Sequence, residues 1–295
     1  MSPFEQELKK TAADVNSRIS DLLPAVEGPE ARVIEAMRYA MEAGGKRLRP
    51  FLIVESGKLF GIEKEMMYRV AVAMECVHTF SLVHDDLPCM DDDDLRRGRP
   101  TTHKAYDEAT AVLAGDALLA FAFELVGSEK THQDPFVRCE LVTQLSKAVG
   151  SSGMIGGQMI DLSMQTLPQD IPTITRLQRL KTGALIAFSC EAGAIMGRAG
   201  REARHALEAY AHDLGLAFQI ADDILDVEGD PEQLGKAAQK DDDAGKATFI
   251  SLMGLERAKA QASMLADQAK QHLVMFDERA DLLRDAADFV VNRRQ

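Results

Sequence analysis

Two short segments of the chain concentrate aspartates beside apolar residues. The first reads SLVHDDLPCMDDDD over residues 81–94, with six acids in ten residues, and the second reads FQIADDILD over residues 218–226. Because neighbouring carboxylates repel one another, some would have to stay protonated unless a cation binds between them. Ligands that are all oxygen suit a hard ion, so the first segment predicts a Mg2+ or Mn2+ site. The competing interpretation is an acidic helix end and a solvated cap, with Asp93 and Asp94 as capping residues.

The spacing of the aspartates predicts which of them can share an ion. Asp222 and Asp226 are four residues apart, so on a helix they lie on one face, about 6 Å apart along the axis. Asp85 and Asp91 are six residues apart, and a straight helix would turn them about 120° from one another. These two can therefore converge only if Pro88 bends or unwinds the chain between them.

Cationic side chains are found near both acidic segments. GGKRLRP covers residues 44–50 and RRGRP covers residues 96–100, while Lys181, Lys236 and Lys246 stand apart. Arginine forks and lysine point charges match phosphate oxygens, although pairing with a neighbouring acid competes for each cation taken singly. Together the two charged sets and the apolar segments around them indicate one ligand class. It has a diphosphate head held through Mg2+ and a hydrocarbon body buried between helices.

The elements that must position these groups are helices. Trp is absent and aromatic residues make up 5% of the chain, while good helix formers recur throughout. Apolar residues repeat at helical spacing over residues 33–41, and the nearly continuous apolar stretch 110–126 predicts a buried helix. No strand–helix rhythm is present. We expect one all-α domain over residues 1–295, in which the long loop 228–245 is a candidate lid.

Charge and composition exclude other classes of protein. The net charge of -13 argues against binding to nucleic acid or to an anionic membrane surface. The four cysteines have no zinc or CxxC spacing, which favours a reducing compartment. The N-terminus lacks an apolar signal region, and Asp116 and Glu191 interrupt the longest apolar stretches. We therefore expect a cytoplasmic protein without a stable membrane anchor.

The motifs resemble those of the short-chain trans-prenyl diphosphate synthases along nearly the whole chain. DDLPCMDDDDLRRGRPTTH is similar to the first aspartate-rich motif of that family in its bacterial and plant form, and FQIADDILD to the second. GGKRLRP, GDALL at residues 115–119, GGQMIDL at residues 156–162 and KTGALI at residues 181–186 also match. The resemblance implies an isoprenoid-synthase-type helical bundle around a deep central cavity, usually as a homodimer. It also implies that an allylic diphosphate condenses with isopentenyl diphosphate.

The resemblance further implies a role for individual residues. Three Mg2+ ions would grip the allylic diphosphate, with Asp86 in a supporting position. The implied metal ligands are Asp85, Asp91, Asp222 and Asp226. The implied substrate-binding residues are Gly45, Lys46, Arg49, His78, Arg96, Arg97, Lys181, Lys236 and Lys246. The implied catalytic set is Lys181, Thr182, Gln219 and Phe80, and the departing diphosphate would accept the proton.

Product length is expected to depend on the helix that carries the first aspartate motif. Phe80 and Ser81 lie five and four residues before Asp85, about 6 to 7.5 Å back along a helix axis. In the family, an aromatic residue followed by a small one goes with bacterial enzymes that make C15 farnesyl diphosphate, so Phe80 is expected to be the floor of the cavity. Ordinary core packing is the alternative for Phe80. The alternative functions are a C20 or C10 synthase, a terpene cyclase, a non-catalytic regulatory subunit, or a plain helical scaffold.

Overall fold

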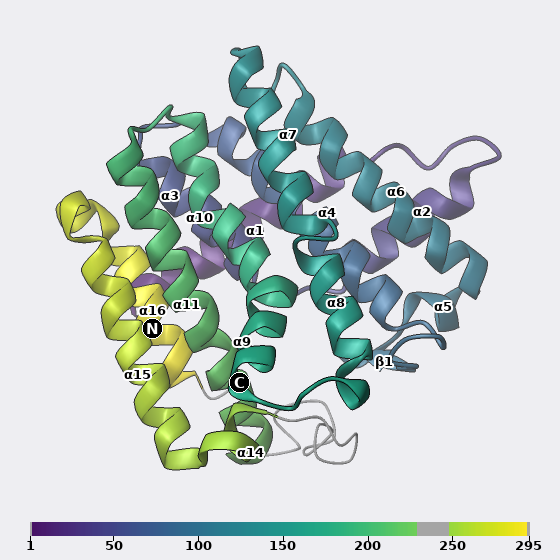
Figure 1. Ribbon diagram of the computed structural model, residues 1–295. Helices are drawn as coiled ribbons and strands as arrows, with labels where there is room; N and C mark the ends of the chain where they lie inside the picture. The colour runs from purple at the N-terminus through teal and green to yellow at the C-terminus, as the bar shows by residue number, and fades with distance from the viewer. Residues whose placement is uncertain (1, 229–247, 294–295) are drawn as a thin grey trace.

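The computed structural model describes residues 2–228 and 248–293, and over these residues the chain is a bundle of α-helices (Figure 1). Within those two ranges the only strands are the two-residue pair β1 (Leu95–Arg96) and β2 (Arg99–Pro100), which are antiparallel. The expectation of an all-α fold is therefore confirmed. Lys236, Lys246 and nearly all of the candidate lid lie outside the described residues.

The helices follow one another with short connections. The first seven are α1 (Pro3–Leu22), α2 (Ala31–Met41), α3 (Leu48–Leu59), α4 (Lys64–Asp85), α5 (Thr102–Ala105), α6 (Glu108–Gly127) and α7 (Pro135–Val149). The next are α8 (Met154–Leu162), the 3-10 turn η1 (Met164–Thr166), α9 (Ile171–Gln178), the π-helical turn η2 (Arg179–Gly183), α10 (Ala184–Met196) and α11 (Arg201–Glu228). The last are α14 (Phe249–Met253), α15 (Leu255–His272), the 3-10 segment η3 (Val274–Ala280) and α16 (Asp281–Asn292).

Local sequence explains where several helices begin. Ser2 and Glu5 form a capping box at the start of α1, and Pro3 takes the first helical position. Asp107 and Asp134 accept hydrogen bonds from backbone N–H groups at the starts of α6 and α7. These side chains satisfy donors that the first turn of a helix leaves unpaired.

Two hydrophobic clusters hold the bundle together. One surrounds α4, which is buried on nearly all sides and packs against α6 and α3. The other joins α11 to α15 and α16, which lie side by side in green and yellow in Figure 1. The two aspartate motifs therefore sit at the end of α4 and near the end of α11, one on each part of the core.

Helix α6 is long and apolar enough, by length and composition, to cross a membrane. The sequence suggested that Asp116 interrupts this stretch, yet the helix continues through it from Glu108 to Gly127. Half of its most apolar stretch is buried inside the protein. The core helix of a soluble protein passes the same test, so this single helix is weak evidence for a span, and the absence of a membrane anchor stays a prediction.

Candidate active site

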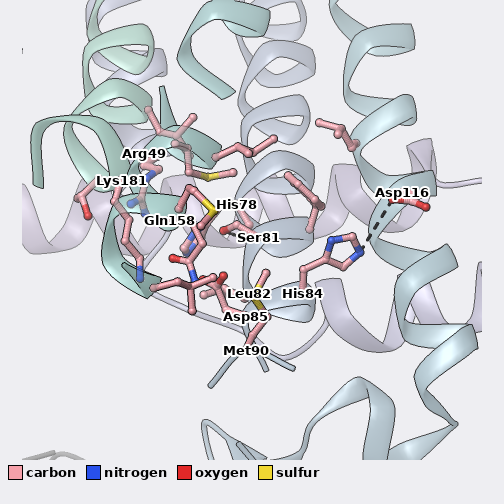
Figure 2. A pocket seen from close by; sticks show the side chains of 18 residues that line it. Arg49, His78, Ser81, Leu82, His84, Asp85, Met90, Asp116, Gln158 and Lys181 are labelled. Atoms are coloured by element: carbon pink, nitrogen blue, oxygen red, sulfur yellow. Dashed lines mark hydrogen bonds and ion pairs between the residues drawn. The ribbon is translucent and has the colours of Figure 1, made fainter. Parts of the chain in front are cut away.

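A cavity of about 490 Å3 opens between α4, α6, α8 and the η2–α10 segment (Figure 2). Asp85 and Lys181 contribute charged groups to its wall, and Leu119 and Met154 are among its apolar residues. A cavity that combines a few charged groups with apolar walls fits a ligand that has an ionic head and a hydrocarbon body.

The first aspartate motif converges because the helix ends. Helix α4 stops at Asp85, and the chain then turns so that the Asp91 amide donates a hydrogen bond to the Asp85 carbonyl at 2.8 Å. Pro88 lies in the middle of this turn. The prediction that the chain must leave the straight helix near Pro88 for Asp85 and Asp91 to meet is confirmed.

The electrostatics of Asp85 fit a bound cation. Burial raises its pKa from 3.8 to about 6, and the charges of Asp91 and Asp86 act in the same direction, against Lys181 and Arg96. Carboxylates that are this poorly compensated gain most from a hard divalent ion with oxygen ligands. Among the described residues no three His, Cys, Asp or Glu side chains already stand close enough to form a metal centre. The metal roles of Asp85, Asp91, Asp222 and Asp226 therefore stay predictions that the donor chemistry fits.

The adjacent Asp86 has a different environment. Its side chain is buried, and both carboxylate oxygens accept hydrogen bonds from Arg96 at 2.5 to 2.9 Å. Asp93 lies 3.9 Å from the same guanidinium. Asp86 thus fixes Arg96 beside the metal-ligand candidates. The expectation that Arg96 binds the allylic diphosphate stays a prediction.

The second aspartate motif lies on α11, as its spacing predicted. Asp222 pairs with Arg293 at 2.5 Å, and the Arg293 guanidinium stacks on the Phe218 ring at 3.9 Å. The neighbouring Asp223 faces the core instead and accepts a hydrogen bond from the Phe249 amide at 2.8 Å. Asp223 therefore anchors α14 to α11, while Asp222 faces the basic groups.

A second cavity, of about 430 Å3, collects basic groups and adjoins the first. It brings together five predicted substrate-binding residues: Gly45, Lys46, Arg49, His78 and Arg97. Arg49 and His78 line both cavities, so the two spaces meet at these side chains. Gln219, in contrast, lines neither of them. Its expected role at the reacting carbons stays a prediction.

The basic cavity has an excess of positive charge. Burial lowers the pKa of Arg49, with Glu75 and Asp222 acting against it. Burial also lowers the pKa of His78 far below 6.5, helped by Arg49 and Arg97, which keeps the imidazole neutral. The Nε atom of Arg49 is buried without a hydrogen-bond partner. Crowded cations with an unused donor fit a polyanionic ligand.

Sequence reasoning missed two parts of this cavity. Arg47, inside GGKRLRP, is buried and forms an ion pair with the equally buried Glu75, so it supports the site from behind. Arg293 enters from the far end of the chain and lines the cavity beside Lys46. The basic pair at the C-terminus was the available signal for Arg293, but neither contact can be read from local spacing.

The glycine-rich loop makes room for an arginine. Gly45 has a φ of 133°, a backbone conformation that favours glycine, and a Cβ there would meet the Arg97 guanidinium at 2.7 Å. Arg97 in turn donates to the Gly44 carbonyl. The GG of GGKRLRP therefore serves to bring Arg97 against this loop.

The GGQMIDL segment, left without a role by the sequence, supports Lys181. A Cβ at Gly157 would collide with the Lys181 backbone in the π-helical turn η2, so only glycine allows this approach. Asp161 accepts a hydrogen bond from Lys181 Nζ at 2.5 Å. Between them, Gln158 faces the first cavity with both polar side-chain atoms buried and without a hydrogen-bond partner (Figure 2). Gln158 is therefore a candidate ligand-facing residue that sequence reasoning missed.

Comparison with known proteins agrees with this site. The family model described as polyprenyl synthetase matches residues 30–282. Farnesyl diphosphate synthase of Escherichia coli is 41% identical over 300 aligned positions, covering 99% of each chain. A crystal structure titled FPP/GFPP synthase from Zymomonas mobilis has a TM-score of 0.89 at 52% identity and covers 98% of both chains. A geranyltransferase structure from Helicobacter pylori, complexed with magnesium and isoprenyl diphosphate, has a TM-score of 0.84 at 33% identity and covers 99% of this chain and 97% of that one.

The chain therefore belongs to the polyprenyl synthetase family and is a trans-prenyltransferase. The predicted resemblance to bacterial members of the family is confirmed. The names of these relatives point to more than one product length, so the family alone does not define the product.

Proposed function

We propose that this enzyme condenses isopentenyl diphosphate with dimethylallyl diphosphate, and then with geranyl diphosphate, to give (2E,6E)-farnesyl diphosphate. The observation that carries the proposal is the pair of cavities that meet at Arg49 and His78. One combines carboxylates with apolar walls and suits an allylic diphosphate. The other is basic and suits the diphosphate of isopentenyl diphosphate. A terpene cyclase would have no use for the second cavity.

The allylic diphosphate binds through the two aspartate motifs. Asp85, Asp91 and Asp222 hold three Mg2+ ions, supported by Asp226, and Lys181 and Arg96 contact the diphosphate oxygens. When bound, the ions supply charge neutralisation that makes the diphosphate a better leaving group. The magnesium and isoprenyl diphosphate named for the Helicobacter pylori structure support this assignment. Lys236 and Lys246, outside the described residues, are proposed to add further contacts.

The chain's own residues then protect and position the reacting carbons. The apolar walls exclude water from the allylic cation, and the Thr182 hydroxyl and the Gln219 amide stabilise it as dipoles without trapping it. Lys46, Arg49 and Arg97 hold isopentenyl diphosphate so that its double bond faces the cation. The proton that is lost after condensation goes to the departing diphosphate.

The floor of the first cavity is proposed to set the product at C15. Phe80 and Ser81 both line this cavity, and Phe80 is 6% exposed. A bulky ring at this depth stops the chain after two condensations. Geranylgeranyl (C20) and geranyl (C10) diphosphate are the alternative products.

A homodimer in the cytoplasm is the proposed working form. Val112 and Leu113 on α6, and Ile155 and Met159 on α8, leave large apolar side chains exposed. Neighbouring exposed apolar side chains of this kind mark interaction sites, and pairing two copies would cover them.

The test is a product assay with labelled isopentenyl diphosphate and each allylic diphosphate, with Mg2+ or with a chelator. We expect a C15 diphosphate from dimethylallyl or geranyl diphosphate, and no product after chelation. A main product of C10 or C20 would overturn the farnesyl assignment. No prenyl product from any allylic diphosphate would instead favour a regulatory subunit.

A further inference from the structure

The GDALL segment has no role in the function proposed above, although its first residues lie against the first cavity. Asp116 lines the cavity, and Gly115 precedes it on α6. Across from them on α4 is His84, which lies between the proposed floor residue Phe80 and the metal-ligand candidate Asp85. Figure 2 shows the His84 ring reaching from α4 toward Asp116.

The His84 ring is fixed to α6 at its far end. Its Nε2 lies 3.1 Å from the Val112 carbonyl oxygen, and because a carbonyl can only accept, Nε2 carries the proton and donates. The same nitrogen is 4.0 Å from a carboxylate oxygen of Asp116. The ring is therefore held by a backbone group that does not change rotamer.

Gly115 provides the space for this contact. A Cβ at Gly115 would collide with the Nε2 and Cδ2 atoms of His84. Any larger residue at this position would therefore push the ring away from the Val112 carbonyl. The constraint is on the His84 side chain rather than on the backbone, because the colliding atoms are all in the ring.

The near face of the His84 ring is in contact with Phe80. The two rings are one helical turn apart on α4 and meet edge to face, with centroids 5.0 Å apart and an interplanar angle of 77°. Edge-to-face contacts restrict the orientation of both rings. Phe80 and His84 both line the cavity, so the orientation of Phe80 determines how far the cavity extends past it.

We propose that His84 is a positioning residue for product length: it is tethered to α6 through Gly115 and Val112, and it holds the Phe80 ring across the path of the growing chain. This inference rests on the proposed function, because it needs a prenyl chain that grows toward Phe80. His84 acts through Phe80 and takes no part in the chemistry.

The test compares product lengths from His84→Ala, Gly115→Ala and Phe80→Ala, with geranyl diphosphate and excess isopentenyl diphosphate. In each variant the Phe80 ring is released or removed, so we expect the ratio of longer to wild-type-length product to rise about tenfold or more, the effect of a small change in pocket shape. The rate of the first condensation should change much less than this ratio. Gly127→Ala is the matched control on α6, because a Cβ there meets only Val142 at 3.9 Å, and it should leave the product unchanged.

His84→Phe separates the tether from simple filling of space. It restores a ring beside Phe80 but cannot donate to Val112, so the product should still be longer than that of the wild type. A wild-type product from His84→Phe would mean that bulk alone suffices and would overturn the tether. Unchanged or shorter products from folded, active His84→Ala and Gly115→Ala, or a shift that persists in these two while Phe80→Ala has none, would overturn the proposal. Failure of the proposed function is distinguishable, since the wild-type enzyme would then make no prenyl product.

Discussion

The raised pKa of Asp85 predicts that divalent-metal binding weakens in mildly acidic solution. A carboxyl group must be ionised to bind the ion, so protons compete with metal below its pKa. With the Asp85 pKa at about 6 in the metal-free protein, about a tenth of this group is ionised at pH 5 and nearly all of it at pH 7.5. The apparent affinity for Mn2+ should therefore fall about tenfold over this range, where an Asp with the ordinary pKa of 3.8 would show little change.

The assay is a titration of the protein with Mn2+ alone, followed by electron paramagnetic resonance at several pH values. Diphosphate is left out because it titrates in the same range. Calorimetry in two buffers of different ionisation enthalpy would also show proton release on binding near pH 6. Asp116→Asn, which removes an exposed carboxylate of the same cavity, should keep the wild-type pH dependence. A flat affinity between pH 5 and 7.5, or a midpoint near 4, would refute the reasoning.

Three further predictions follow from buried charges. In the metal-free protein, burial of the Asp85 charge costs stability above pH 6, and this cost disappears as the pH falls through 6; Asp85→Asn should therefore raise the melting temperature at pH 7.5 and have a smaller effect at pH 5. Glu75→Ala leaves Arg47 buried without its ion partner and should lower the free energy of unfolding by about 3–5 kcal/mol in urea melts, and a loss below 1 kcal/mol would count against the pair. Arg293→Ala should raise the KM for isopentenyl diphosphate several-fold with little change in that for geranyl diphosphate, and equal changes in both would contradict its placement in the basic cavity.

Local spacing predicted much of the acidic half of the site. Asp222 is placed on one helix with Asp226 because four residues make about one turn. The meeting of Asp85 and Asp91 was foreseen because a proline between them is incompatible with a continuing straight helix. These inferences need only helix geometry and the steric limits of proline, and both act within a few residues.

Contacts between distant segments could not be predicted in the same way. Arg293 reaches Asp222 across 71 residues, and Arg47 reaches Glu75 across 28, so neither pairing leaves a periodic signal. Asp223 has the same sequence environment as Asp222 yet faces the core, because Phe249 offers it a backbone N–H there. Each outcome depends on which helix packs against which, and this is settled by tertiary packing rather than by propensity.

The central claim is that aspartates of α4 and α11 hold one metal–diphosphate group together. Anomalous diffraction from crystals grown with Mn2+ and a non-hydrolysable geranyl diphosphate analogue tests it most directly. We predict metal peaks in contact with Asp85 and Asp91 on one side and with Asp222 on the other, with the diphosphate between them and the geranyl chain directed toward Phe80. Metal peaks at one motif only, or a diphosphate bound away from both motifs, would contradict this account.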